Sequence, residues 1–161
     1  MTPITTRRNQ YALRAIFELA KRSGQGPTKI AHIAQAQGIP VRFLEVILNR
    51  LKRSGLVDAR RGASGGYFLT RSAGRITVAD IMTFMHGPSK PALCAACVAK
   101  AKCTHGNRCA FSGMWNRVSQ AVLQVYTQTT IQDLLDNDRQ RHGKRPSLST
   151  RSHQMRQGRS L

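Results

Sequence analysis

Hydrophobic residues recur every three or four positions in the first third of the chain, which is the spacing of amphipathic helices. A first helix is predicted from about Arg8 to Arg22, with Thr5 or Thr6 as its N-cap. Thr28 is predicted to cap a second helix. A third helix is predicted over Pro40–Arg53. Pro40 suits its first turn, because the amide proton that proline lacks would have no hydrogen-bond partner there. The three apolar stripes are Leu13, Ile16, Phe17 and Ala20, then Ile30, Ile33 and Ala34, then Leu44, Ile47, Leu48 and Leu51.

The third helix has the outline of a DNA-recognition helix. It follows the second helix after a tight turn at Gly38, as in a helix-turn-helix. The side opposite its apolar stripe suits contact with base edges in a major groove. That side carries Arg42, Glu45, Asn49 and Lys52. An ordinary solvated helix face fits the same pattern, so this helix alone does not decide between the two interpretations.

The segments that follow favour the DNA interpretation. Residues 56–60 and 67–70 are predicted to be strands, joined by the glycine-rich loop 61–66 into a β-hairpin wing. Arg60 and Arg61 stand at its tip, and the glycines let the backbone approach a phosphate. The predicted fold class is therefore mainly α with a small β-hairpin wing, a winged helix-turn-helix. The candidate DNA-binding residues are Thr28, Arg42, Glu45, Asn49, Lys52, Arg60, Arg61, Gly65, Gly66 and Tyr67.

Three more helices are predicted after the wing. Thr77 and Asp80 form a capping-box pattern that begins the first of them. A longer helix runs from about Ala110 to Thr127, and a short one from Ile131 to Leu135. The long helix has an apolar stripe that a monomer of this size can hardly cover, which favours a dimerisation helix. Packing back onto its own domain is the alternative. The stripe consists of Trp115, Val118, Val122 and Val125.

The chain is strongly basic. It carries 26 Lys+Arg against 7 Asp+Glu, a net charge of +19, and the last 25 residues supply +6 through 6 Arg, 1 Lys and 1 Asp. This favours double-stranded DNA over an anionic membrane, and no stretch is apolar for long enough to span a bilayer. The tail from Asn137 is predicted to be disordered. No signal peptide opens the sequence, which predicts a cytoplasmic location.

All four cysteines lie between Cys94 and Cys109, separated by gaps of two, five and five residues. In a reducing compartment, clustered cysteines bind metal or act in redox chemistry more often than they form structural disulfides. The candidate metal ligands are Cys97, Cys103 and Cys109, with Cys94 as an additional one. Spacing alone favours an iron–sulfur cluster and a four-cysteine zinc site equally. A thiol switch without metal is a third interpretation.

An enzyme is not expected. The sequence shows no Ser/His/Asp set, no carboxylate pair and no dinucleotide-binding loop, and 7 acidic residues leave little from which to build a catalytic site. An iron–sulfur electron carrier or enzyme is the less favoured alternative to a DNA-binding regulator.

Five motifs follow one another in a definite order: Tyr11–Ile16, Phe43–Glu45, Leu51–Val57, Arg61–Tyr67 and Ile76–Ile81. In this order they resemble the Rrf-two family of winged-helix regulators, of which IscR, NsrR and RirA are members. The resemblance covers about residues 4 to 136. It implies a homodimeric transcription factor, usually a repressor. The predicted organisation is a winged helix-turn-helix domain over 1–86, a cysteine loop and dimerisation helix over 87–136, and a basic tail over 137–161.

The resemblance also implies a role for the cysteines. In many family members three cysteines in this region bind a [2Fe-2S] or [4Fe-4S] cluster, and Cys97, Cys103 and Cys109 match them. The implied signal is nitric oxide, iron or redox state. The fourth ligand of other members is a histidine, here replaced by Ser112, or an acidic residue of the partner's first helix, here about Gln10. Cys94 or a small molecule are the remaining candidates for this ligand.

Overall fold

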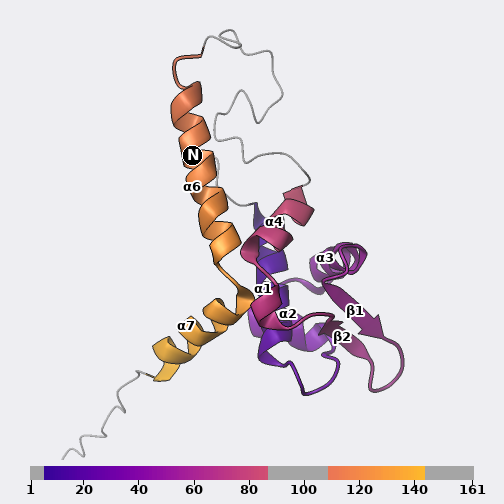
Figure 1. The fold of residues 1–161 in the computed structure, drawn as a ribbon. Coiled ribbons are helices and arrows are strands. Elements are labelled where there is room, and N and C mark those ends of the chain that lie inside the picture. Colours follow the sequence, from indigo (N-terminus) through magenta and orange to yellow (C-terminus); the bar gives the residue numbers. More distant parts are fainter. Residues whose placement is uncertain (1–5, 87–108, 144–161) are drawn as a thin grey trace, which may run out of the picture.

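The computed structural model describes residues 6–86 and 109–143, which form a mainly helical domain with a small β-hairpin (Figure 1). The elements are α1 (Arg7–Lys21), α2 (Ile30–Gln37), α3 (Val41–Arg53), β1 (Val57–Arg60), β2 (Gly66–Leu69), the 3-10 helix η1 (Ala73–Arg75), α4 (Val78–His86), α6 (Ser112–Gln128) and α7 (Ile131–Gly143). The predicted fold class is confirmed. Helices α2 and α3 form the helix-turn-helix, and β1 and β2 form the wing.

Helix α1 lies at the centre of the domain and packs against α2, α3, α4 and α7. Thr6 caps it, because its hydroxyl accepts a hydrogen bond from the Asn9 amide at 3.4 Å. Contacts on several sides leave Ala12, Ala15 and Ile16 without exposed surface. The apolar stripe predicted for α3 is also buried against this core. The predicted stripe of α3 is therefore confirmed, whereas that of α1 is only partly right: Ile16 and Ala20 are buried, but Leu13 and Phe17 are half-buried.

Helix α2 does not begin as predicted. Its N-cap is Lys29, which makes no side-chain capping bond, and Thr28 lies outside the helix. Thr28 instead exchanges two backbone hydrogen bonds of 2.8 Å with Tyr67 of β2. The prediction of Thr28 as a helix cap is wrong, because pairing with a strand far along the chain takes the place of the local cap.

The wing is an antiparallel pair in which Val57 lies opposite Leu69 and Arg60 lies opposite Gly66. Both strands begin within one residue of the predicted positions. Gly66 is required at its position, since a Cβ there would lie 2.5 Å from the carbonyl carbon and oxygen of Thr28. This close approach holds the wing against the segment before α2, so the wing has a fixed place beside the helix-turn-helix.

Helix α4 begins with the predicted capping box. The Asp80 amide donates to the Thr77 hydroxyl at 3.1 Å, and the Thr77 amide donates to the Asp80 carboxylate at 2.8 Å. Thr130 and Asp133 repeat this arrangement at the start of α7. At the start of both helices, nearby side chains therefore accept hydrogen bonds from the backbone amides.

The starts of α4 and α7 lie side by side. The Val78 amide donates to the Thr129 carbonyl, and the Ile131 amide donates to the Ile76 carbonyl, each at 2.9 Å. Since Thr129 directly follows α6, these two bonds attach the C-terminal end of α6 to the winged domain. The N-terminal end of α6 lies far from this attachment (Figure 1).

Helix α7 is longer than predicted. It runs over Ile131–Gly143 rather than to Leu135, so the predicted disorder from Asn137 is wrong for residues 137–143. Charged pairs rather than apolar spacing accompany this extension: Asp138 contacts Lys21 of α1 at 3.3 Å, and Asp136 contacts Arg139 at 3.4 Å. The remaining tail, residues 144–161, lies outside the described residues.

Candidate DNA interface and cysteine site

Helix α3 exposes the side that was predicted to face DNA. Arg42, Glu45, Asn49 and Lys52 are all exposed. Among the described residues Glu45 makes no hydrogen bond or ion pair, so both its oxygens are free to accept one, as from a cytosine amino group. The chain's other six carboxylates all have partners: Glu18, Asp58, Asp80, Asp133, Asp136 and Asp138.

Lys52 has a nearby carboxylate but is not held by it. Its Nζ lies 3.7 Å from Asp58 Oδ1 of β1, and the two side chains are 39% and 56% exposed. An exposed pair of this kind contributes at most about 1 kcal/mol. Lys52 therefore remains available to a DNA phosphate.

The wing exposes its two arginines and buries Gly65. Arg60 and Arg61 are exposed, whereas Gly65 is buried and its amide donates to the Gly62 carbonyl at 2.9 Å. A side chain at Gly65 would collide with the Arg60 carbonyl. Gly65 and Gly66 therefore set the shape of the wing, and the exposed charge at the tip comes from the arginines.

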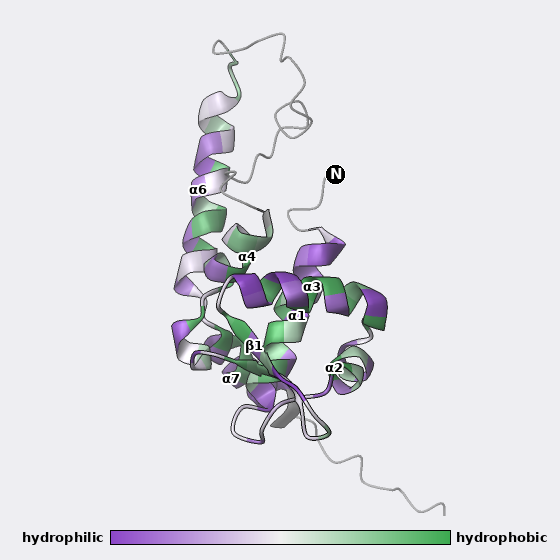
Figure 2. Ribbon diagram, turned by 90° about the vertical axis from the view of Figure 1, so that its right-hand side faces the viewer, coloured by the Kyte–Doolittle hydropathy of each residue, from purple (hydrophilic) through white to green (hydrophobic). Residues whose placement is uncertain are grey.

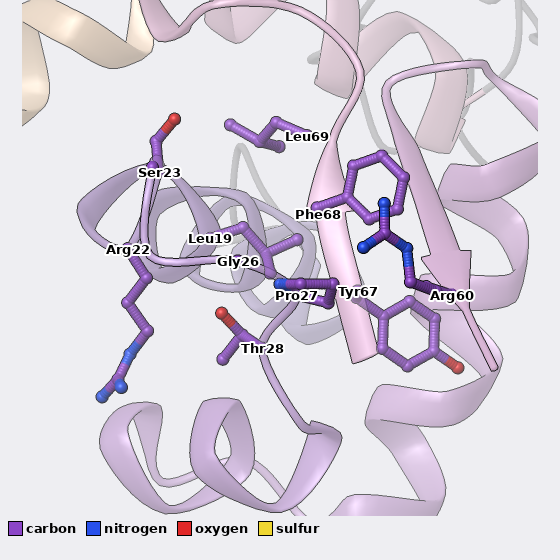
Figure 3. A pocket seen from close by; sticks show the side chains of 11 residues that line it. Leu19, Arg22, Ser23, Gly26, Pro27, Thr28, Arg60, Tyr67, Phe68 and Leu69 are labelled. Atoms are coloured by element: carbon purple, nitrogen blue, oxygen red, sulfur yellow. The ribbon is translucent and has the colours of Figure 1, made fainter. Parts of the chain in front are cut away.

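Thr28, Arg60 and Tyr67 border a pocket of about 290 Å³ between the end of α1, the segment before α2 and the wing (Figure 3). Figure 3 shows Arg60 and Tyr67 on one side of it and Arg22 and Ser23 on the other. Thr28 is only 6% exposed, so it is an interior residue that positions the wing rather than a surface residue. The pocket itself was not predicted, because its lining residues come from elements that are separate in the chain.

A buried carboxylate ties α1 to the end of α2. Glu18 is 4% exposed and accepts hydrogen bonds from Arg22 Nε at 2.7 Å and Gln37 Nε2 at 2.9 Å. Burial raises the pKa of Glu18, but these hydrogen bonds and the charges of Arg22 and Lys21 outweigh it. The pKa of Glu18 consequently lies below its ordinary value of 4.5. The ionised side chain steadies the turn that leads into α3. Sequence inspection missed this contact, whose only signal was the Glu18–Arg22 spacing of four.

One side chain of α3 connects the recognition helix to α4. Arg50 Nη2 donates to the Phe84 carbonyl at 3.4 Å, and its guanidinium lies 5.9 Å from the centre of the Phe84 ring. Helix α4 ends at His86, where the segment that carries the cysteines begins. Arg50 therefore links the recognition helix directly to α4.

Cys109 is half-buried and lies just before α6. Its carbonyl accepts a hydrogen bond from the amide of Ser112, the first residue of that helix, at 3.1 Å. The other predicted ligands, Cys94, Cys97 and Cys103, lie outside the described residues. Within the described part of the chain there is no group of three or more His, Cys, Asp or Glu side chains that could hold a metal ion. Gln10 is exposed on α1.

Helix α6 contributes no buried side chain to the domain. The predicted stripe is divided: Trp115 and Val122 are half-buried, whereas Val118 and Val125 are 38% and 60% exposed. Met114 and Leu123 are exposed as well. No helix among residues 6–86 and 109–143 is long and apolar enough to cross a membrane.

Comparison with known sequences identifies the fold and its role together. A family model named Rrf2 and described as an iron-dependent transcriptional regulator matches residues 5–137. The chain belongs to the Rrf2 family. Over 132 residues it is 33% identical to the HTH-type transcriptional regulator IscR of Xenorhabdus nematophila, which covers 82% of this chain and 79% of that protein. The corresponding identity with IscR of Yersinia pseudotuberculosis is 32%, with the same coverage.

Solved structures agree with this membership. T. potens IscR superimposes with a TM-score of 0.73 at 27% identity, covering 88% of this chain and 93% of that one. CymR, described as the global cysteine regulator of B. subtilis, gives 0.70 at 32% identity, covering 83% and 96%. An oxidized form of Staphylococcus aureus CymR gives 0.61 at 29% identity, covering 80% and 93%. This member of the Rrf2 family is thus a transcriptional regulator of the IscR type and not an enzyme.

Proposed function

We propose that this regulator binds an operator as a homodimer and represses transcription, and that an iron–sulfur cluster controls the binding. The observation that carries this proposal is the place of the cysteine series in the chain. The series starts after α4, which contacts the recognition helix, and ends at Cys109, directly before the exposed helix α6. A ligand bound there would join the two helices that lead to the DNA-binding surface and to the partner.

The donor set fits such a cluster. Cys97, Cys103 and Cys109 would supply three thiolates, and Cys94 is a candidate for the fourth position. When bound, the cluster supplies a redox-active iron centre. Lys100, Lys102 and Arg108 stand between these cysteines in the sequence, and their positive charge would offset the negative charge of the cluster. The description of the matching family as iron-dependent supports iron over zinc.

The path from this site to DNA uses residues of the winged domain. Helix α4 precedes the cysteine segment, and Phe84 in α4 contacts Arg50 in α3 through a hydrogen bond and through its ring. A displacement of α4 therefore shifts α3, whose exposed side carries Arg42 and Glu45. DNA is sensitive to such shifts, because both recognition helices of a dimer must fit grooves about one turn apart.

The partner is a second copy of the chain, bound through α6. This helix buries no side chain in its own domain, and its apolar positions include Val118, Val122 and Val125. Their spacing of four and three is that of helices that pack along each other. Association through α6 would also bring two recognition helices together in one dimer.

The central test compares operator binding by anaerobically reconstituted and metal-free protein at one fixed salt concentration. Cys97→Ser, Cys103→Ser and Cys109→Ser should each abolish the visible absorption of the cluster and change operator affinity, while the dimer remains folded. Cys94→Ser is the matched control, with an equal effect only if Cys94 is the fourth ligand. Equal affinity in both forms, or zinc without a response to redox state or nitric oxide, would contradict cluster sensing.

A thiol switch without metal is the second candidate. The likeness to CymR, including the oxidized form, favours it specifically. In that case metal-free protein should respond to oxidant through disulfide formation, and iron should have no effect on affinity. Mass measurement of oxidised and reduced metal-free protein, together with operator binding, separates the two mechanisms.

The assignment of the DNA surface has its own test. Arg42→Ala or Glu45→Ala should change the sequences enriched from a random pool, with each lost base contact costing about 1–3 kcal/mol. Arg60→Ala and Arg61→Ala should weaken binding to all sequences, because the wing supplies phosphate contacts. Thr28, Gly65 and Gly66 contribute by holding the wing in place. Unchanged enrichment with Arg42→Ala and Glu45→Ala would show that α3 does not read bases.

A further inference from the structure

The outward face of α3 has a hydrophobic residue at its centre. Residues 42, 46, 49 and 53 follow one another at intervals of four, three and four, so they share one face of the helix. This face lies opposite the buried stripe. Arg42, Asn49 and Arg53 are exposed there, and Val46 lies among them with 63% of its surface exposed. Val46 therefore does not pack in the hydrophobic core.

Exposed large hydrophobic side chains are confined to two places in the described part of the chain. Five belong to α6 or to Phe111 at its start, where the proposed dimer would cover them. The other three are Val41, Phe43 and Val46 of α3. Phe43 is 64% exposed and stands three residues before Val46, so the two side chains are neighbours on the helix surface. The winged domain thus leaves its large hydrophobic side chains uncovered only on its recognition helix.

The charge around Val46 indicates what covers it. Arg42 and Arg53 flank it on the same face, and Arg60 and Arg61 stand on the neighbouring wing. A basic rim of this kind attracts the phosphates of DNA rather than a hydrophobic protein surface. The major groove offers one apolar group to a hydrophobic side chain, the 5-methyl group of thymine.

We propose that Val46 reads thymine methyl groups in the operator, and so specifies a base that Arg42 and Glu45 do not recognise. Arginine pairs with guanine and glutamate accepts from cytosine, whereas a valine has no hydrogen bond to offer and selects a methyl group by apolar contact. The face therefore combines polar and apolar base recognition. This inference rests on the proposed binding of operator DNA.

The test removes single methyl groups from the DNA. Duplexes are first selected from a random pool with the full-length wild-type protein. Each thymine of the selected site is then replaced by deoxyuridine, which lacks only the 5-methyl group. At one thymine position in each half-site, we expect the wild-type affinity to fall about three- to fivefold, as for the loss of one buried methyl-sized group. In Val46→Ala the same replacement should change the affinity less than about twofold.

Two further variants test whether the deoxyuridine effect depends specifically on the side chain at position 46. Val46→Thr keeps the shape of the side chain but replaces a methyl group with a hydroxyl, and should also reduce the deoxyuridine effect. Gln120→Ala alters an exposed residue of α6 on the side away from its apolar stripe, and should leave the effect as in wild type. Thermal melting of all variants checks that the fold is retained, since Val46 is exposed.

The outcomes separate this inference from the proposed function. If the pool yields no enriched sequence, operator binding itself is contradicted. If a sequence is enriched but no deoxyuridine effect depends on residue 46, DNA binding stands and methyl reading by Val46 is wrong. If Val46→Ala instead weakens self-association in sedimentation while the DNA profile is unchanged, the Phe43–Val46 surface contacts protein, which also overturns the inference.

Discussion

The winged domain and α6 treat hydrophobic side chains in opposite ways. In the winged domain the stripes of α1, α2 and α3 meet in one core, and Leu44, Leu48 and Leu51 have no exposed surface. Helix α6 is longer than any of these helices but buries none of its side chains. Figure 2 shows green, hydrophobic segments along the outer length of α6 as well as inside the domain.

The difference teaches that the two regions are stable for different reasons. The winged domain buries its apolar surface within one chain, so its stability depends on its own sequence. The apolar surface of α6 is only partly covered within the chain, and we propose that a second copy covers the rest. The predictions below test this division, from the largest expected effect to the smallest.

Leu48→Ala should lower the free energy of unfolding by about 2–5 kcal/mol, because it leaves a cavity in the core. If the winged domain is stable by itself, Leu48→Ala should lower the free energy of unfolding equally in the wild type and in a variant that does not dimerise. Urea denaturation of the single and double variants measures both values. A loss that shrinks markedly in the monomer would show that the core depends on the dimer.

Val125→Asp should weaken self-association by about 2 kcal/mol or more, roughly 30-fold, because it places an unpaired charge in the proposed interface. The winged domain should remain folded, as judged by circular dichroism. Gln120→Asp on the opposite side of α6 is the control and should leave the dissociation constant unchanged. Analytical ultracentrifugation over a range of concentrations gives the result. Equal behaviour of the two variants would argue that another surface mediates association.

Glu18→Gln should destabilise the winged domain by about 1–3 kcal/mol at pH 7, since a charge-assisted bond between α1 and α2 is lost. The pKa of Glu18 is lower in the folded chain than in the unfolded one. Its contribution is therefore fully present above the unfolded pKa and is lost as the pH falls through the folded pKa. Urea denaturation should show the two proteins converging below about pH 4. A constant difference between pH 7 and pH 3 would assign the effect to packing.

Thr77→Ala should destabilise the domain by about 1 kcal/mol through loss of the capping box of α4. The backbone bonds between α4 and the start of α7 would remain, so the attachment of α6 should persist. Thr83→Ala, at an exposed position of the same helix, should change stability by less than about 0.5 kcal/mol. Thermal melting compares the two. A larger loss for Thr77→Ala, together with altered dimerisation, would show that the cap also holds α6.

Deleting residues 144–161 should have the smallest effect on stability. The deletion removes 4 Arg and 1 Lys but no acidic residue, a charge of +5. The melting temperature should stay within a degree or two of wild type, while the salt dependence of DNA binding should become shallower by up to about four units of slope. Titrations at several salt concentrations measure this. An unchanged slope would mean that the tail does not contact DNA.

The candidate DNA site was partly predictable, because exposure on α3 follows from helical spacing. Arg42, Glu45 and Asn49 lie opposite the apolar stripe and are exposed as predicted. Val46 was overlooked although it falls outside that stripe, since a hydrophobic residue in a helix is ordinarily assigned to the core. Thr28 was misplaced for a different reason: its partner Tyr67 lies in another element.

The sequence by itself determined the order of the helices, the wing, the capping box at Thr77 and the family, because each depends on spacing between residues close in the chain. The tertiary structure decided the features that join distant segments. These are the Thr28–Tyr67 pairing, the contact of Arg50 with Phe84, and the extension of α7 beside Lys21. Local patterns report which face of an element is apolar, but they do not report which other element covers that face or leaves it open.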